Sequence, residues 1–100
     1  MPRRSIERIR ALIRQRQYDL TAHAIEEAAE DELDIVDVER AVLGGEITRM
    51  ERDDPRGTKY VIEGPAAEGV VRVGVVGRFT GTGRYLIITV YAIHQETGGN

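Results

Sequence analysis

The sequence predicts an α+β fold in which two to three N-terminal helices pack on a four-stranded antiparallel sheet. Apolar residues recur at helical spacing up to Leu43, and from Glu46 onward they alternate with a period of two, as in strands. Gly44-Gly45 separates the two patterns and is typical of the end of a helix. Because the helices precede the strands along the chain, the segregated α+β class is favoured.

Each expected helix has its own start or stop signal. Ser5 is expected to cap the first helix, and Thr21 is expected to cap the second. Asp34 begins the third, and Asp37 resembles the far end of a capping box with aspartate in place of glutamate. Gly44-Gly45 can adopt the left-handed conformation that ends this helix. We expect the helices at residues 6–15, 22–32 and 34–44.

Turn residues divide the second half into four strands. Asp53-Asp54-Pro55-Arg56-Gly57 is a strong turn signal, Gly64-Pro65 begins a loop, and residues 80–83 form a hairpin loop. Gly74 and Gly77 mark bulges or close backbone contacts. The last strand is almost wholly apolar, and we expect it to be the central one. We expect the strands at residues 46–52, 58–63, 70–79 and 85–91.

The chain shows no internal repeat and no linker, so residues 18–92 are expected to form a single α+β domain. Residues 18–20 run extended at its start. Residues 1–17 form a basic helical extension, and residues 93–100 form a frayed tail. One hundred residues suffice for one hydrophobic core without cross-links.

Composition excludes several kinds of site. The chain has no cysteine, so disulfides, thiolate zinc sites and cysteine nucleophiles are excluded. No apolar run approaches the roughly 18 residues of a membrane span, and the basic start leads into a charged helix rather than a secretory signal. We therefore expect a cytoplasmic protein without membrane contact. The acidic residues between 26 and 37 lack the spacing and glycine of an EF-hand, so neither a metal nor a cofactor is expected.

Charge is unevenly distributed along the chain, whose net charge is −3. Residues 1–17 hold six arginines and one glutamate, whereas residues 18–54 hold thirteen acidic residues and three arginines. A protein that grips nucleic acid over its whole surface is usually basic throughout. Any nucleic-acid contact must therefore come from the N-terminal helix or the C-terminal strands.

Five short motifs, in order, give the chain a family resemblance. They are Thr21-Ala22-His23-Ala24, Asp37-Val38, Gly45-Glu46-Ile47, Asp53-Asp54-Pro55-Arg56-Gly57 and Ile88-Thr89-Val90-Tyr91. Over residues 18–92 the chain thereby resembles the domain of unknown function 4258 family of small bacterial proteins. That family is likened to RNase toxins of the RelE and barnase-like kind, whose helices pack on a four-stranded antiparallel sheet.

The chain departs from the family pattern after the His-Ala pair. Many family members continue with arginine, as in His-Ala-x-x-Arg, but Glu27 stands at that position and Asp31 one helical turn later. A carboxylate there repels a phosphate that a cation would hold. The departure favours a binding module over a nuclease.

His23 and Tyr91 are the candidate catalytic residues. The resemblance implies RNA cleavage, for which a histidine in the first helical turn suits general acid–base chemistry. Tyr91 would supply a positioning hydroxyl. The alternative is that His23 hydrogen-bonds the adjacent strand and stabilises the start of its helix.

Four basic residues on or beside the strands are candidates for phosphate binding: Lys59, Arg72, Arg78 and Arg84. Arg72 and Arg78 are an even number of residues apart on one strand, so they point to the same side. The alternative is a solvated face whose arginines pair with the acidic helices.

Three arginines of the first helix are candidates for binding RNA or an acidic partner: Arg8, Arg10 and Arg14. Alternatively, they offset the acidic segment within the chain or across a homodimer.

Three functions are compatible with the sequence, and whether the protein is an enzyme stays open among them. The leading one is a non-catalytic module that binds a protein partner or RNA. The others are a RelE-like toxin relative with His23 as acid/base and a structural homo-oligomer.

Overall fold

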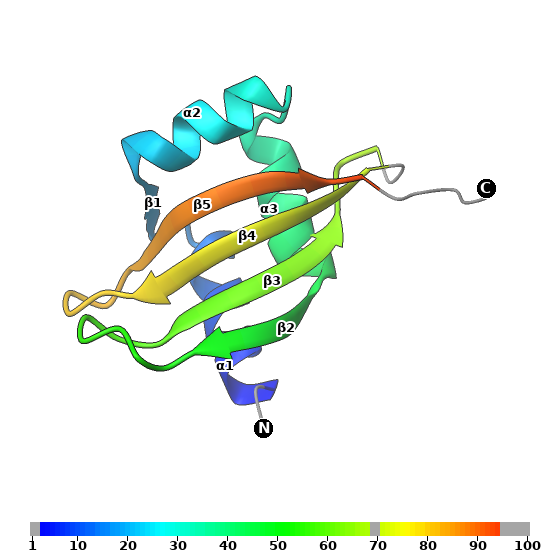
Figure 1. Cartoon of the computed structure of the whole chain (residues 1–100). Helices are drawn as coiled ribbons and strands as arrows, with labels where there is room; N and C mark the ends of the chain where they lie inside the picture. Colours follow the sequence, from blue (N-terminus) through cyan, green and yellow to red (C-terminus); the bar gives the residue numbers. More distant parts are fainter. Residues whose placement is uncertain (1–2, 69–70, 95–100) are drawn as a thin grey trace.

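The computed structural model describes residues 3–68 and 71–94. It contains three helices and a five-stranded sheet, which confirms the α+β class (Figure 1). The helices are α1 Arg3–Arg14, α2 Ala22–Glu30 and α3 Ile35–Gly44. The strands are β1 Tyr18–Leu20, β2 Glu46–Glu51, β3 Lys59–Pro65, β4 Arg72–Phe79 and β5 Tyr85–Ile93. Of the expected frayed tail, residues 95–100 lie outside the described residues, and Ile93 belongs to β5.

The sheet has the strand order β1-β5-β4-β3-β2. The expected antiparallel sheet consists of β2 to β5, and β1 adds a short fifth strand that runs parallel to β5. The expectation that the last strand is central is wrong, because β1 covers only Tyr85 to Ile87 of β5. β4 is the central strand, with partners along both sides.

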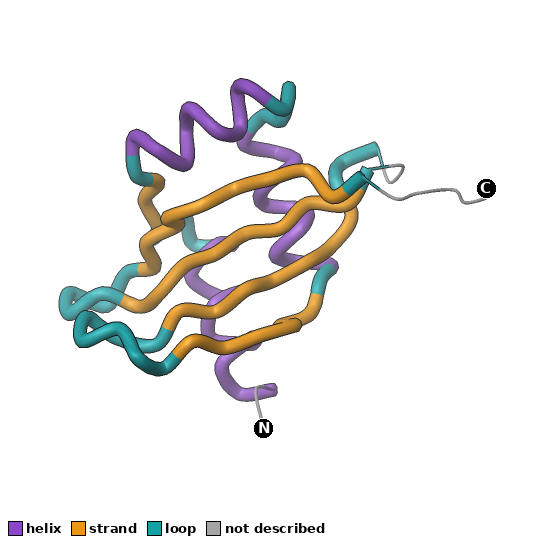
Figure 2. Tube along the Cα trace, viewed as in Figure 1, coloured by secondary structure: helices purple, strands orange, loops and turns teal. Residues whose placement is uncertain are grey.

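The helices occupy one face and one edge of the sheet. Figure 2 shows α1 and α3 behind the four long strands, and α2 along the edge formed by β5. The core lies between the sheet and these helices. The largest fully buried side chains of the core are Ile9, Val38, Val42, Ile62, Val73, Val75, Tyr85, Ile87 and Val90. Among the described residues, no helix combines the length and apolar character of a membrane span.

α1 packs back on the domain through its isoleucine stripe. Ile9 is fully buried and Ile13 is 2% exposed. The guanidinium of Arg10 donates to the carbonyl oxygen of Gly45 at 2.7 Å, which satisfies a carbonyl at the end of α3. The expected Ser5 cap is wrong, because α1 begins at Arg3 and Ser5 lies inside it.

The caps of α2 and α3 agree with the sequence-based expectations. Thr21 Oγ1 accepts the backbone N–H of Ala24 at 3.0 Å. Asp34 and Asp37 form the reciprocal capping box, with each carboxylate accepting the backbone N–H of the other residue. Both short helices therefore begin where local side-chain chemistry dictates.

The end of α3 is set by close packing rather than by left-handed backbone. Gly45 has an extended conformation, with φ of −103°, so the expected left-handed stop is wrong. A Cβ on Gly45 would lie 2.4 Å from the carbonyl oxygens of Ala41 and Glu63. Gly64 belongs to β3 rather than to a loop, and it contacts the backbone of Gly45. The two glycines let α3 and β3 approach each other closely.

Candidate functional site

α1 and α3 leave one face of the sheet uncovered, and we call it the open face (Figure 1). Along β4, Val73 and Val75 belong to the core beneath the helices and are fully buried. The alternate positions of β4 therefore point to the open face, and these include Arg72 and Arg78. The two arginines share one side of the strand.

Tyr91 lies on the open face opposite Gly74 of β4. A Cβ on Gly74 would lie 2.2 Å from Cζ of the Tyr91 ring, so the ring rests on the bare backbone of β4. Burial raises the pKa of the Tyr91 hydroxyl, and the negative charge of Glu63 raises it further. The hydroxyl is therefore protonated at neutral pH and can donate a hydrogen bond to an anion.

Arg72 and Arg78 have no carboxylate partner among the described residues. Arg72 donates one hydrogen bond to the carbonyl oxygen of Glu63 at 3.3 Å. Arg78 is half-buried, and its Nε is buried without a hydrogen-bond partner. Six positions along a strand separate the two Cα atoms by about 20 Å. This separation fits an extended anionic chain better than a single phosphate group.

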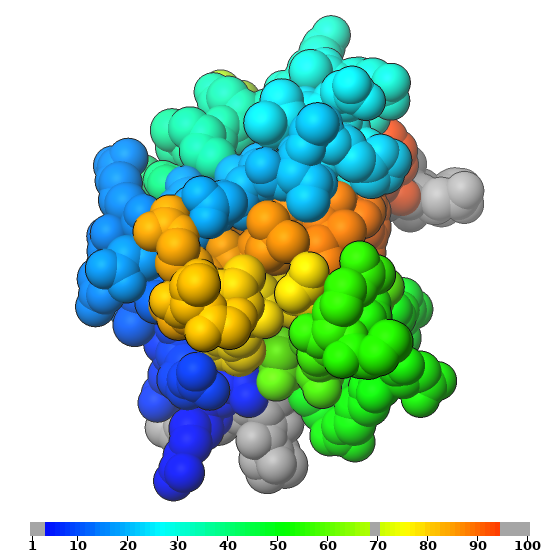
Figure 3. Space-filling view, turned by 90° about the vertical axis from the view of Figure 1, so that its left-hand side faces the viewer, coloured from blue at the N-terminus to red at the C-terminus, as the bar shows by residue number. Residues whose placement is uncertain are grey.

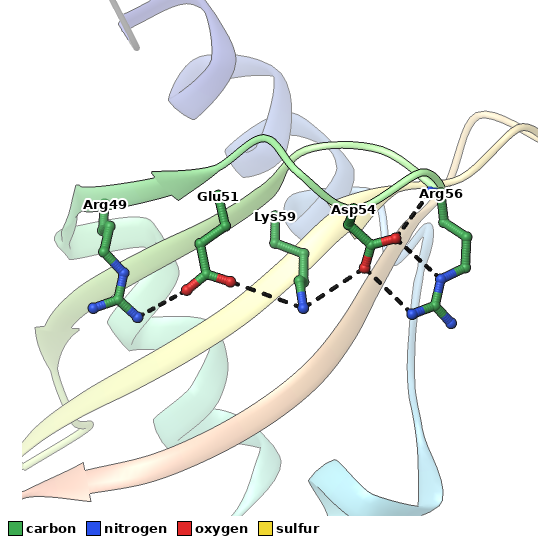
Figure 4. A network of polar contacts seen from close by, with 5 residues as sticks. All are labelled: Arg49, Glu51, Asp54, Arg56 and Lys59. Atoms are coloured by element: carbon green, nitrogen blue, oxygen red, sulfur yellow. Dashed lines mark hydrogen bonds and ion pairs between the residues drawn. The ribbon is translucent and has the colours of Figure 1, made fainter.

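Lys59 also points to the open face, but its charge is balanced by carboxylates. Its Nζ lies 3.8 Å from Glu51 Oε1 and 3.6 Å from Asp54 Oδ2. Figure 4 shows the lysine at the centre of a chain of contacts that continues to Arg49 and Arg56. Lys59 therefore has a structural role in joining β2 to β3, whatever else it binds.

The Asp-Pro-Arg-Gly motif builds the turn between β2 and β3. Asp54 Oδ1 accepts the backbone N–H of Arg56 at 2.8 Å, and the Arg56 side chain donates to the same carboxylate. These hydrogen bonds, with the positive charge of Lys59, lower the pKa of Asp54 to about 2. Gly57 completes the turn with a φ of +126°, which favours glycine. This family motif thus has a local structural explanation.

α2 closes the edge of β5 with side chains (Figure 3). Glu27 Oε1 accepts the backbone N–H of Val90 at 3.0 Å, and Asp31 Oδ2 accepts that of Ala92 at 2.8 Å. β1 is too short to pair with the backbone N–H groups of Val90 and Ala92. On an exposed strand edge, such unpaired groups can bind a strand of another chain. The two residues that depart from the family's arginine pattern therefore cap the sheet edge.

His23 has a carboxylate partner that the sequence analysis did not identify. Its Nε2 lies 3.0 Å from Glu27 Oε2, and the imidazole side chain is 66% exposed. Glu27 is held in turn by Val90, so the strand, the carboxylate and the imidazole form one chain of contacts. The spacing of four residues on a helix was the signal available in the sequence.

His23 lies on the open-face side of α2, beside the middle of the sheet. It precedes Ile25 by two residues, a rotation of roughly 200° around the helix, and Ile25 lines a groove against α3. Thr21 contacts Ile88 and Glu27 contacts Val90, so His23 lies at that level of β5. This level corresponds to the stretch of β4 between Arg72 and Arg78.

The other candidate residues lie apart from the open face. Arg84 donates to both oxygens of Asp19, at 2.8 and 3.2 Å, and thereby ties the β4–β5 loop to β1. Its guanidinium lowers the pKa of the Asp19 carboxyl. Arg8 lies over the Phe79 ring at 4.2 Å from the centroid. Arg10 caps α3, whereas Arg14 is exposed in the last turn of α1.

One protein family matches most of the chain. The model of the family described as "Domain of unknown function (DUF4258)" matches residues 20–92. It covers α2, α3 and β2 to β4, and it ends one residue before the end of β5. The sequence-based resemblance is thereby confirmed for the family, while the likeness to RelE and barnase-like toxins stays a prediction. A search of curated proteins and a search of solved structures gave no match.

Proposed function

Because the chain belongs to the domain of unknown function (DUF4258) family, whose description assigns no activity, we propose from its own geometry that it binds single-stranded RNA on the open face. The observation that carries the proposal is a pair of arginines on an uncovered sheet face, neither of which has a carboxylate partner within the described part of the chain. Sheets with exposed aromatic and basic side chains are a common platform for single-stranded nucleic acid.

The separation of the arginines supports a polymer as ligand. A backbone that carries successive phosphates can contact Arg72 and Arg78 together across about 20 Å. Tyr91 lies on β5 opposite Gly74, at a position along the sheet between the two arginines. The Tyr91 ring offers a base a stacking surface, and its hydroxyl can donate to a phosphate oxygen. Carboxylates border this path on both sides, those of α2 beyond β5 and Glu63 of β3 at the level of Tyr91, so they confine the ligand to the strip along β4 and β5.

Replacing Arg72 or Arg78 with glutamate is expected to weaken RNA binding by about tenfold or more, because each change puts an anion beside a phosphate. Fluorescence anisotropy with a labelled oligouridylate at several salt concentrations measures the affinity. For single strands, log K falls with log salt, and the loss of one phosphate contact makes this slope less negative by about 0.7.

Arg40→Glu is the matched control for this experiment. It changes the net charge by the same amount at an exposed position on α3, behind the sheet. We expect its affinity to stay within about twofold of the wild type, since salt screens distant exposed charges. Equal losses in all three variants would mean that net charge alone governs binding, and no binding by the wild type at low salt would refute the proposal.

A second candidate function, cleavage of the bound RNA, is favoured by the contact between His23 and Glu27. A hydrogen bond from Nε2 to the carboxylate leaves Nδ1 free to accept a proton. In this reaction Nδ1 accepts the proton of a ribose 2′-hydroxyl as its oxygen attacks the adjacent phosphorus. A 2′,3′-cyclic phosphate forms, and the 5′-oxygen of the next nucleotide leaves and takes a proton from water. The exposed imidazole would reach an RNA that crosses β4 and β5.

His23→Ala is expected to lower the cleavage rate by at least about a hundredfold, because it removes the general base. Gel electrophoresis of a labelled oligouridylate under single-turnover conditions measures the rate. His94→Ala changes the only other histidine, which is exposed beyond β5, and should leave cleavage unchanged. Full cleavage by His23→Ala would remove His23 from the mechanism, and binding without cleavage by the wild type would leave a non-catalytic module.

A further inference from the structure

A second surface, away from the open face, contains a mostly apolar groove. It lies between α2 and α3, with Leu20, Ala28 and Val38 among the residues that line it, and it has a volume of about 320 Å³. Ile25 and Ile35 stand on its two sides and are 56% and 43% exposed. Such large aliphatic side chains gathered around one groove are typical of an interaction surface.

The segment that forms most of the groove is rich in negative charge. Residues 18–39 contain nine carboxylates and neither lysine nor arginine. Most of these carboxylates bind groups of the domain itself, as Glu27 and Asp31 do at the edge of β5. Glu26 and Glu32 are exposed on α2 and just after it, and neither side-chain carboxylate has a hydrogen bond or ion pair with another described residue. Glu26 follows Ile25 and Glu32 precedes Leu33, two residues that line the groove, and the acidic residue Asp34 lines the groove itself.

We propose that this groove binds an amphipathic helix of a partner protein, with aliphatic side chains on one face and lysine or arginine beside them. The apolar walls fit the aliphatic side chains, and the acidic rim fits the flanking cations. The chain's own basic helix does not supply this occupant, because the apolar stripe of α1 is buried in its own core through Ile9 and Ile13. This surface is independent of the RNA-binding proposal, since it uses the opposite flank of α2.

Three synthetic peptides test the proposal with the intact chain. The first is an amphipathic helix of leucine and lysine, the second has glutamate in place of lysine, and the third has serine in place of leucine. We expect only the leucine–lysine peptide to bind, as measured by isothermal titration calorimetry. Ile25→Asp and Ile35→Asp are each expected to weaken its binding by about tenfold or more, because each puts a carboxylate into the apolar contact.

Val71→Asp is the matched control variant. Val71 is 40% exposed and lies outside the groove, so this change adds the same charge without touching the proposed contact. Its binding should equal that of the wild type, and circular dichroism should show all three variants folded. Equal binding of the serine–lysine peptide would overturn the proposal in favour of charge alone, and equal losses in all three variants would overturn it because binding would then not depend on the groove. Light scattering that shows a dimer lost in Ile25→Asp would overturn it in favour of a second copy of the chain.

Discussion

Gly64→Ala is expected to destabilise the protein by about 3 kcal/mol, because the added methyl group overpacks a backbone contact. Its Cβ would lie 2.2 Å from the carbonyl oxygen of Ala41 and 2.7 Å from Cα of Gly45. These are backbone atoms of α3 and its end, so no side chain can rotate away. Relief requires α3 to move off β3, and the core between them would open.

Thermal unfolding followed by circular dichroism measures this effect, and a loss of about 3 kcal/mol corresponds to a fall in Tm of roughly 15 °C for a domain of this size. Gly81→Ala is the control, because a Cβ on Gly81 meets nothing within 4 Å. We expect its Tm to match the wild type. If Gly64→Ala is equally stable, the close approach of α3 and β3 described above is wrong.

Ile9→Ala is expected to cost about 3 kcal/mol, within the range for truncating a buried isoleucine. Ile9 is fully buried although α1 lies outside the part of the chain that the family model matches. The truncation leaves a cavity between α1 and the core, so stability should fall if α1 is an integral part of the domain. Urea unfolding with a constant m-value measures the free-energy change.

Arg14→Ala is the control. It changes an exposed residue of the same helix to alanine without removing a core contact, so it measures the effect of the substitution on the helix alone. Surface substitutions away from special contacts change the free energy of unfolding by about 0.5 kcal/mol or less. A small effect of Ile9→Ala, similar to that of Arg14→Ala, would mean that α1 contributes little to the fold and is a mere extension.

Most of the fold follows from local sequence signals. The caps at Thr21 and Asp34 were predictable because each satisfies backbone groups within three residues of itself. The turn at Asp54 was predictable for the same reason. The strand β1 was harder to predict, because three residues are too few to show a strand period. Its pairing with β5 also joins segments far apart in the chain.

The candidate site was predictable only in part. The shared side of Arg72 and Arg78 follows from strand periodicity alone. The pairing of Arg84 with Asp19 does not, because those residues are 65 positions apart and meet only when β1 docks. The sequence also suggested that Glu27 weakens a phosphate site. In the fold this carboxylate orients His23 and binds Val90.

The sequence by itself determined the α+β class, the family, and the start of α2 and α3, because periodicity, motif order and caps act over a few neighbouring residues. Only the tertiary structure decided that α2 lies along the edge of β5 and that α1 packs on the core. It also decided that the basic residues of β3 and β4 share an uncovered face with Tyr91. These arrangements depend on contacts such as that between Glu27 and Val90, 63 residues apart, which burial and hydrogen-bond satisfaction select only when the whole chain is folded.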